Sequence, residues 1–103
     1  MRVYDYKPKG FKGSVKIQIP NYKQRLNYVK ESGFEIGETV SLKNNIDALL
    51  VLIDVAEKHI KEINLEKGRE SIKSWEELLD SDHNDIIQQI ALMMVLGGGL
   101  GEA

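Results

Sequence analysis

The apolar positions of residues 42–63 form the most regular pattern in this sequence. They recur in alternating steps of four and three, at Leu42, Ile46, Leu49, Ile53, Ala56, Ile60 and Ile63. Such steps place side chains on one face of an α-helix, so the pattern predicts a long central helix with Ser41 as its N-cap. We interpret this stripe as the inward face of the helix and the spine of the domain. A coiled-coil seam between copies is the alternative.

The same segment also carries apolar residues outside the stripe. Residues 48–53 are apolar without a break, and residues 92–96 make the end of the last predicted helix apolar nearly all round. A core of this size leaves some of that surface for another protein. The candidate interface residues are Ala48, Val51, Leu52, Val55, Leu92, Val95 and Leu96.

Upstream of this segment, a strand and a helix are predicted. Apolar residues alternate with polar ones over residues 15–19, which is the period of a half-buried strand, and Pro20 ends it. Asn21 followed by Gln24 is typical of a helix N-terminus, and Gly33 is placed to end that helix in the left-handed conformation. We expect the helix over residues 22–32, with Tyr22, Leu26 and Val29 on its inner face.

Downstream, the pattern predicts a small hairpin and two more helices. Lys67-Gly68 is typical of a turn, so that Ile63 and Leu65 could pair with Ser71 and Ile72. Ser74 and Glu77 predict a capping box for a short helix over residues 75–79, with Trp75, Leu78 and Leu79 on one face. A last helix over residues 83–96, capped by Ser81 or Asp82 and ended by Gly97, has the buried stripe Ile86, Ile87, Ile90, Met93 and Met94.

Together these elements predict an α+β fold, a mainly helical small domain with a small antiparallel sheet or hairpin. We expect a basic and aromatic arm at residues 1–13, one globular domain at 14–97 and a flexible glycine-rich tail at 98–103. Residues 34–40 are expected to be a connector, with a short strand at 34–36 as an option.

Composition limits the class of protein. The 103 residues include no cysteine, which excludes disulfides and cysteine-based zinc sites. Charged residues make up 29% and hydrophobic residues 42% of the chain, as in ordinary soluble proteins. Neither a signal peptide nor an apolar run long enough to span a bilayer is recognisable, so a cytoplasmic location is expected.

Charge is divided unevenly along the chain. Residues 1–30 hold eight basic residues and one acidic residue, whereas the rest holds six basic and fifteen acidic residues. Five aromatic residues interleave with the basic ones, and aromatic platforms beside cations are typical of single-stranded nucleic-acid binding. The candidate basic patch comprises Lys7, Lys9, Lys12, Lys16, Lys23 and Arg25. Packing of the tyrosines on the core is the simpler alternative.

Catalytic, cofactor and metal sites are not expected. Acidic residues cluster between residues 76 and 85, and Asp80-x-Asp82-x-Asn84 begins like a calcium loop. However, such a loop needs glycine at its sixth position and glutamate at its twelfth, where this chain has Asp85 and Ala91. Helix capping explains these acids more simply. His59, on the polar face of the central helix, and His83 are expected at the surface. The glycines after residue 96 follow a helix, whereas phosphate loops precede one. The protein is therefore predicted not to be an enzyme.

The C-terminal half resembles small tail assembly chaperones of tailed bacteriophages. The resemblance rests on residues 72–79 (IKSWEELL) after the Lys67-Gly68 turn, and on a closing helix that ends in Gly97-Gly98. Residues 13–26 also look like the opening of phage proteins of this size. The resemblance covers residues 13–97 in outline and implies a strand, a serine-capped helix and a closing helix.

The function implied by this resemblance is non-enzymatic. Such chaperones coat the tape measure protein, keep it soluble and help to recruit tail tube subunits, so the expected partners are these proteins and further copies of the chain. A small nucleic-acid-binding or regulatory protein that uses the basic patch is the alternative. A third option is a structural component of the virion, such as a tail or connector protein.

Overall fold

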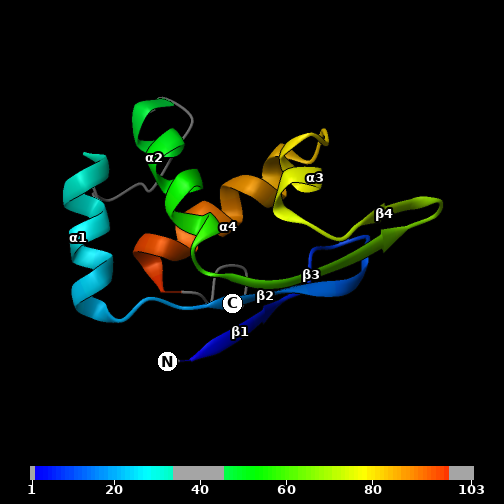
Figure 1. Cartoon of the computed structure of the whole chain (residues 1–103), viewed down its shortest axis with the longest axis horizontal. Coiled ribbons are helices and arrows are strands. Elements are labelled where there is room, and N and C mark those ends of the chain that lie inside the picture. Colours follow the sequence, from blue (N-terminus) through cyan, green and yellow to red (C-terminus); the bar gives the residue numbers. More distant parts are fainter. Residues whose placement is uncertain (1, 34–45, 98–103) are drawn as a thin grey trace.

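A computed structural model of the chain describes residues 2–33 and 46–97. Within them, a four-stranded antiparallel sheet lies against four helices, which confirms the predicted α+β class (Figure 1). The strands are β1 (Val3–Tyr6), β2 (Lys12–Gln18), β3 (Ile60–Lys67) and β4 (Glu70–Ile72), and the helices are α1 (Tyr22–Ser32), α2 (Ile46–Glu57), α3 (Trp75–Leu79) and α4 (Asn84–Leu96). No helix in the described residues is long and apolar enough to cross a membrane.

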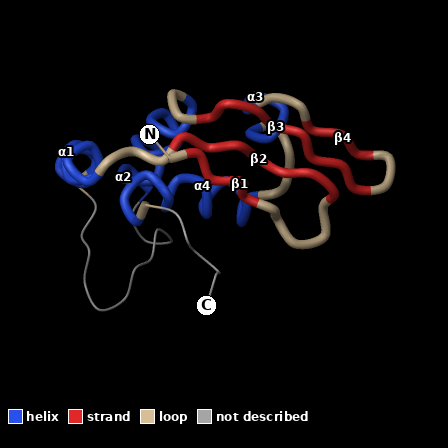
Figure 2. The backbone as a smooth tube through the Cα atoms, turned by 90° about the horizontal axis from the view of Figure 1, so that it is seen from below, coloured by secondary structure: helices blue, strands red, loops and turns tan. Residues whose placement is uncertain are grey.

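The strands follow one another in the order β1-β2-β3-β4, with the helices on one face of the sheet (Figure 2). Val15 pairs with Ile63 and Leu65 pairs with Ile72, and all four side chains are buried. Leu65 opposite Ile72 is the contact that the predicted hairpin requires, so that prediction is confirmed. Side chains alternate between the two faces of a strand, so these residues set the sheet face that meets the helices.

The opposite sheet face is polar. Lys16 lies opposite Asp5 on one neighbouring strand and opposite Glu62 on the other, with its amino group 4.0 Å from the Glu62 carboxylate. Opposite charges that face each other across strands stabilise the pairing by a few tenths of a kcal/mol. This alternation explains why the strand pattern was recognisable at residues 15–19.

Helix α1 begins and ends where its capping residues predict. Asn21 accepts a hydrogen bond from the Gln24 backbone, and the Gln24 side chain accepts one from the Asn21 backbone. Gly33 ends the helix with a φ of 71°. The predicted inner face is wrong for Tyr22 and Leu26, which are 68% and 50% exposed, whereas Val29 is half-buried and packs against the core.

The predicted central helix is wrong in its C-terminal part and in its orientation. Helix α2 ends at Glu57, and Ile60 and Ile63 belong to β3. Of the stripe residues in α2, Ile46 is 67% exposed and only Ala56 is buried. Ala48, Leu52 and Val55, which were predicted to face a partner, are buried in the core instead. The physical reason is that residues 48–53 are apolar all round, so the pattern alone does not fix the rotation of the helix about its axis.

Helix α4 is the element on which the other helices converge. It contacts α1, α2 and α3, and seven of its 13 residues are buried, including the whole predicted stripe. Gly97 ends it in the left-handed conformation, as predicted. Its N-cap is His83, without a side-chain hydrogen bond, so the predicted Ser81 or Asp82 cap is wrong.

The short helix α3 has the predicted Ser74 cap, which accepts a hydrogen bond from the Glu77 backbone. Trp75 and Leu78 are buried beneath it, whereas Leu79 is 39% exposed. The prediction for its inner face is therefore correct for two residues of three.

The domain boundaries can be compared with the elements. The expected arm at residues 1–13 contains β1, which pairs with β2, and the boundary at residue 13 falls within β2. The predictions for the Ser41 cap, for the connector at 34–40 and for the tail at 98–103 lie outside the described residues.

Candidate functional site

A cleft of about 580 Å³ is formed by four separate segments of the chain. They are β1, the loop between β1 and β2, the end of β3, and the first turns of α4. The cleft is lined by Tyr4, Asp5, Tyr6, Lys7, Lys9, Phe11, Lys67, His83, Asp85, Ile86 and Gln89. This volume lies in the range of roughly 300–1,000 Å³ that is usual for sites of small ligands.

Phe11 lines the cleft and contacts two other lining residues. The edge of its ring meets the ring of His83 at a centroid distance of 4.8 Å and an angle of 85°. The Lys67 amino group lies over the Phe11 ring, 5.6 Å from its centroid. A cation over an aromatic face is attractive, so the loop between β1 and β2 is held to both β3 and α4 by this ring.

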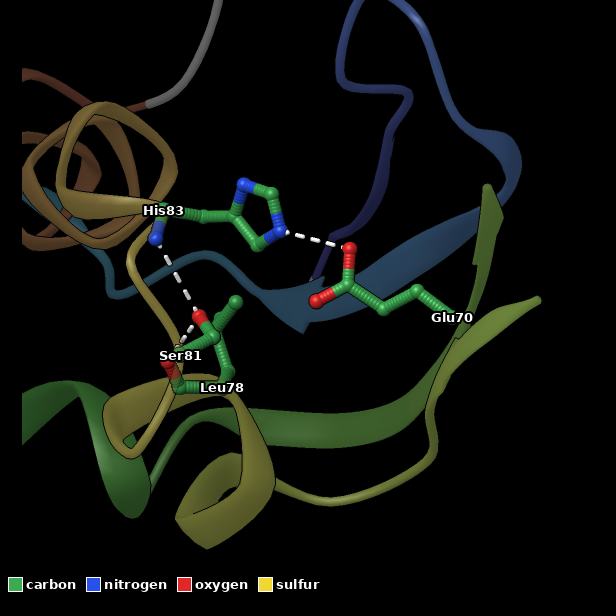
Figure 3. Close-up of polar contacts among 4 residues, drawn as sticks. All are labelled: Glu70, Leu78, Ser81 and His83. Atoms are coloured by element: carbon green, nitrogen blue, oxygen red, sulfur yellow. Dashed lines mark hydrogen bonds and ion pairs between the residues drawn. The ribbon is translucent and has the colours of Figure 1, made fainter. Parts of the chain in front are cut away.

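The imidazole of His83 is fixed by two further contacts (Figure 3). Its Nε2 lies 2.9 Å from the Glu70 carboxylate at the start of β4. Its backbone amide donates to the hydroxyl of Ser81, which itself donates to the Leu78 carbonyl at 2.6 Å. His83 is therefore oriented from both sides and serves to shape the cleft wall.

Tyr6 and Asp85 also line the cleft and interact electrostatically. Burial raises the pKa of the Tyr6 hydroxyl above its ordinary value of 10.0, and the Asp85 carboxylate raises this pKa further. Asp85 stands in the first turn of α4, where a negative charge interacts favourably with the helix dipole. The Tyr6 hydroxyl therefore stays protonated, as a hydrogen-bond donor, at neutral pH.

Three lysines surround this cleft. Lys7, Lys9 and Lys67 are exposed, and no carboxylate within residues 2–33 and 46–97 forms an ion pair with them. Lys7 and Lys9 belong to the predicted basic patch, whereas Lys67 was missed. Proximity of Lys67 to the N-terminal loop depends on the β2–β3 pairing, which no local pattern reveals.

The remaining members of the predicted basic patch are placed elsewhere. Lys12 lies opposite Glu66 in the sheet, and Lys16 pairs with Glu62. Lys23 is on α1, and Arg25 donates to the Pro20 carbonyl at 2.8 Å. The structure thus divides the patch between the cleft, the outer sheet face and α1.

The predicted protein-interface residues are largely in the core. Ala48, Leu52, Val55 and Val95 are at most 6% exposed, and Val51, Leu92 and Leu96 are half-buried. As an exposed interface, the set is therefore wrong for Ala48, Leu52, Val55 and Val95. They are buried because α2 packs against α4 with this face.

Exposed apolar side chains are found instead on α1 and on α2. Tyr22 and Leu26 on α1 and Ile46 and Leu50 on α2 are each at least half exposed. The two helices pack side by side (Figure 1). Both pairs are spaced four residues apart and so lie on one face of their helix. We call these four exposed residues, two on each of the neighbouring helices, the outer helical face.

His59 is a buried residue that the sequence interpretation placed at the surface. It is only 6% exposed, in the turn between α2 and β3. Its Nδ1 lies 2.8 Å from the Gln18 carbonyl, and its Nε2 lies 2.8 Å from the Tyr28 hydroxyl. The misplaced end of the central helix caused this error, because a helix continuing to residue 63 would expose His59.

The described part of the chain contains no group of three or more acidic or histidine side chains positioned to hold a metal ion. Its two histidines are each held by structural partners, Tyr28 with Gln18 for His59 and Glu70 for His83.

No family model, curated protein or solved structure matches this chain.

Proposed function

We propose that the protein is a non-enzymatic assembly chaperone of a tailed bacteriophage. In this role it binds the tape measure protein in the host cytoplasm and associates with further copies of itself. The observation that carries the proposal is the outer helical face, where Tyr22, Leu26, Ile46 and Leu50 are 68%, 50%, 67% and 57% exposed. Apolar side chains at helical spacing suit the groove of another helix.

The stretch that resembles such chaperones supports the proposal. Residues 72–79 form the end of β4 and the serine-capped helix α3, and α4 then closes the domain before Gly97. These are the local features that the resemblance implies. A client that is long and helical would meet the outer helical face without disturbing α4, which lies in the core.

The charge distribution supports self-association. The first 30 residues carry eight basic residues and one acidic residue, and the rest of the chain is acidic. Copies that stack with the basic part of one against the acidic part of the next would form an extended coat. Exposed charges would then guide the contact, whereas the outer helical face would bind the client.

Coexpression with a tape measure protein tests the proposal. We expect the wild-type chain to keep the tape measure protein soluble and to co-purify with it. Leu26→Glu combined with Leu50→Glu should abolish co-purification, because both carboxylates would be desolvated in the contact. Both side chains are about half exposed, so this variant should keep its melting temperature.

Two controls make the experiment specific. Asn27→Glu adds one negative charge to α1 beside Leu26, as Leu26→Glu does, and should leave co-purification intact. Val55→Glu places a charge in the core, where Val55 is 5% exposed, and should unfold the chain. A tape measure protein that stays insoluble with the wild-type chain, or binds the Leu26/Leu50 variant equally well, would contradict the proposal.

A further inference from the structure

The cleft between the N-terminal strands and α4 is separate from the outer helical face and has its own chemistry. It combines three kinds of group: aromatic rings from β1 and the following loop, cationic lysines around it, and hydrogen-bonding side chains on α4. The client-binding role proposed above uses none of them.

The cations are suited to phosphate. Lys7 and Lys9 come from the loop between β1 and β2, and Lys67 approaches from β3. In the part of the chain that the structure describes, three carboxylates form ion pairs with other residues, namely Glu62 with Lys16, Glu66 with Lys73, and Glu70 with His83. Asp5 and Asp85 line the cleft itself, but neither forms an ion pair with its lysines. The three cleft lysines are left with their charges uncompensated by an ion pair, and a phosphate group would compensate them.

The aromatic side chains are suited to a planar ring. Tyr4, Tyr6 and Phe11 are partly buried and pack against the core, so their rings are held in place rather than free in solvent. Phe11 is further held by its contacts to His83 and Lys67. Stacking of a base on a fixed aromatic ring contributes roughly 1–3 kcal/mol and needs no particular base.

The α4 wall adds groups that can distinguish bases. Asp85 and Gln89 are four residues apart on α4, hence on one face, and both line the cleft. A carboxylate only accepts hydrogen bonds, so Asp85 favours a base with an exocyclic amino group. The Gln89 amide can both donate and accept. Cytosine carries an exocyclic amino group on C4, whereas thymine carries a carbonyl oxygen on the same atom.

We propose that this cleft binds a nucleotide that carries an amino-bearing base, with its phosphate on Lys7, Lys9 and Lys67 and its base against the aromatic wall and Asp85. The nucleotide is either free or one unit of a single-stranded nucleic acid. This site does not involve the outer helical face, so it can be present whether or not the chain binds a tape measure protein.

Titration of the full-length chain with two probes tests the proposal. Cytidine monophosphate represents the free nucleotide, and a fluorescent oligodeoxycytidine represents the single strand; binding is measured by NMR shift changes at the cleft and by anisotropy. Binding of both or of the mononucleotide alone assigns a nucleotide site, and binding of the oligonucleotide alone assigns a single-strand site. Absence of binding by either probe overturns the proposal.

Variants with equal charge changes identify the site. Lys7→Ala, Lys9→Ala and Lys67→Ala together should weaken binding by about tenfold or more, and for the single strand should reduce the slope of log affinity against log salt by about 2. Lys23→Ala, Lys30→Ala and Lys58→Ala remove the same charge from α1 and from the turn after α2, and should have a much smaller effect. Equal losses in the two triple variants would overturn the site.

Base preference provides a second readout. Oligodeoxycytidine should bind more tightly than oligothymidine, and Asp85→Ala should remove that preference while leaving the melting temperature nearly unchanged. A preference that survives Asp85→Ala would overturn the role of Asp85 in the proposal. Binding of an acidic peptide at the cleft lysines, with neither nucleotide probe bound, would show a protein-binding site instead.

Discussion

The imidazole of His59 accepts a hydrogen bond from the hydroxyl of Tyr28 across a distance of 2.8 Å, linking the turn before β3 to α1. A carbonyl can only accept, so Nδ1 carries the ring proton that binds the Gln18 carbonyl, and Nε2 is the acceptor. The two rings also meet edge to face, with centroids 5.6 Å apart. This single residue therefore ties together the sheet, α1 and the end of α2.

Removal of the Tyr28 hydroxyl should destabilise the fold. Tyr28→Phe leaves the buried Nε2 of His59 without its partner, which we expect to lower the free energy of unfolding by about 1–3 kcal/mol. Urea unfolding followed by circular dichroism measures the change. Tyr22→Phe is the matched control on the same helix, because Tyr22 is 68% exposed, and it should change the value by less than about 0.5 kcal/mol. Equal effects of the two variants would contradict a structural role for the Tyr28–His59 bond.

Glycine at position 13 should be indispensable for the pairing of β2 with β3. Its φ is 94°, and a Cβ there would stand 1.9 Å from the Asn64 carbonyl oxygen. Gly10 has a similar φ of 89° but open space around the same position. Gly10→Ala should therefore cost only the conformational strain, about 1–2 kcal/mol, and Gly13→Ala distinctly more. Thermal unfolding compares them, and equal melting temperatures for the two variants would count against this difference.

The alkaline titration of Tyr6 should respond to Asp85. Burial is the larger cause of the raised Tyr6 pKa and Asp85 the smaller, so Asp85→Asn should lower that pKa without returning it to 10.0. Burial and Glu31 raise the pKa of Tyr28 in the same way, so Glu31→Gln should lower the Tyr28 value and leave Tyr6 unchanged. NMR of ring-labelled tyrosines across alkaline pH measures the pKa of Tyr6 and that of Tyr28 separately in each variant.

The raised Tyr6 pKa also fixes the direction of a pH effect on stability. In the unfolded chain Tyr6 ionises near its ordinary pKa of 10.0, whereas in the folded chain it holds its proton to higher pH. The contribution of protonated Tyr6 to the stability of the fold is therefore complete below pH 10, and it is lost as the pH rises through the folded-state pKa of Tyr6. Asp85→Asn should make this alkaline loss smaller. A larger loss in the variant would show that the Asp85 contribution has the opposite sign.

Self-association should weaken as salt rises. The contact proposed between copies joins the basic first 30 residues to the acidic remainder, and exposed charges are screened by ions. Sedimentation velocity should show smaller species at about 1 M salt, where the Debye length is about 3 Å, than at about 0.1 M, where it is about 10 Å. Sedimentation that is the same at both salt concentrations would exclude this mode of association.

Elements whose ends depend on neighbouring residues were predictable. Asn21 with Gln24 and Gly33 set both ends of α1, and Ser74 set the start of α3, because each cap satisfies backbone groups within a few residues. The β3–β4 hairpin was likewise predictable from its turn at Gly68, where φ is 60°.

The end of α2 was not predictable because two periods overlap there. Ile60 and Ile63 continue the helical spacing of residues 42–56, but Ile63 and Leu65 also alternate with polar neighbours as in a strand. Pairing of Ile63 with Val15 and of Leu65 with Gly13 brings residues 60–67 into the sheet. The partner strand β2 is far away in the sequence, since Val15 and Ile63 are almost 50 residues apart.

The cleft was predictable only in part. The aromatic and basic character of residues 4–11 was visible, and Lys7 and Lys9 were named as candidates. The addition of Lys67, Asp85 and Gln89 required strand pairing and the packing of α4. Local patterns report which residues share one face of one element, not which elements meet.

The sequence by itself determined the α+β class, the ends of α1, the hairpin and the buried stripe of α4, because capping, turn geometry and side-chain periodicity act over a few residues. Only the tertiary structure decided that α2 turns Ala48, Leu52 and Val55 inward and leaves Ile46 and Leu50 outside. Its apolar residues cover most of its circumference, so packing against α4 selects the buried side. As a result, the exposed apolar residues of α2 are Ile46 and Leu50 of the outer helical face, and not the predicted interface residues Ala48, Leu52 and Val55.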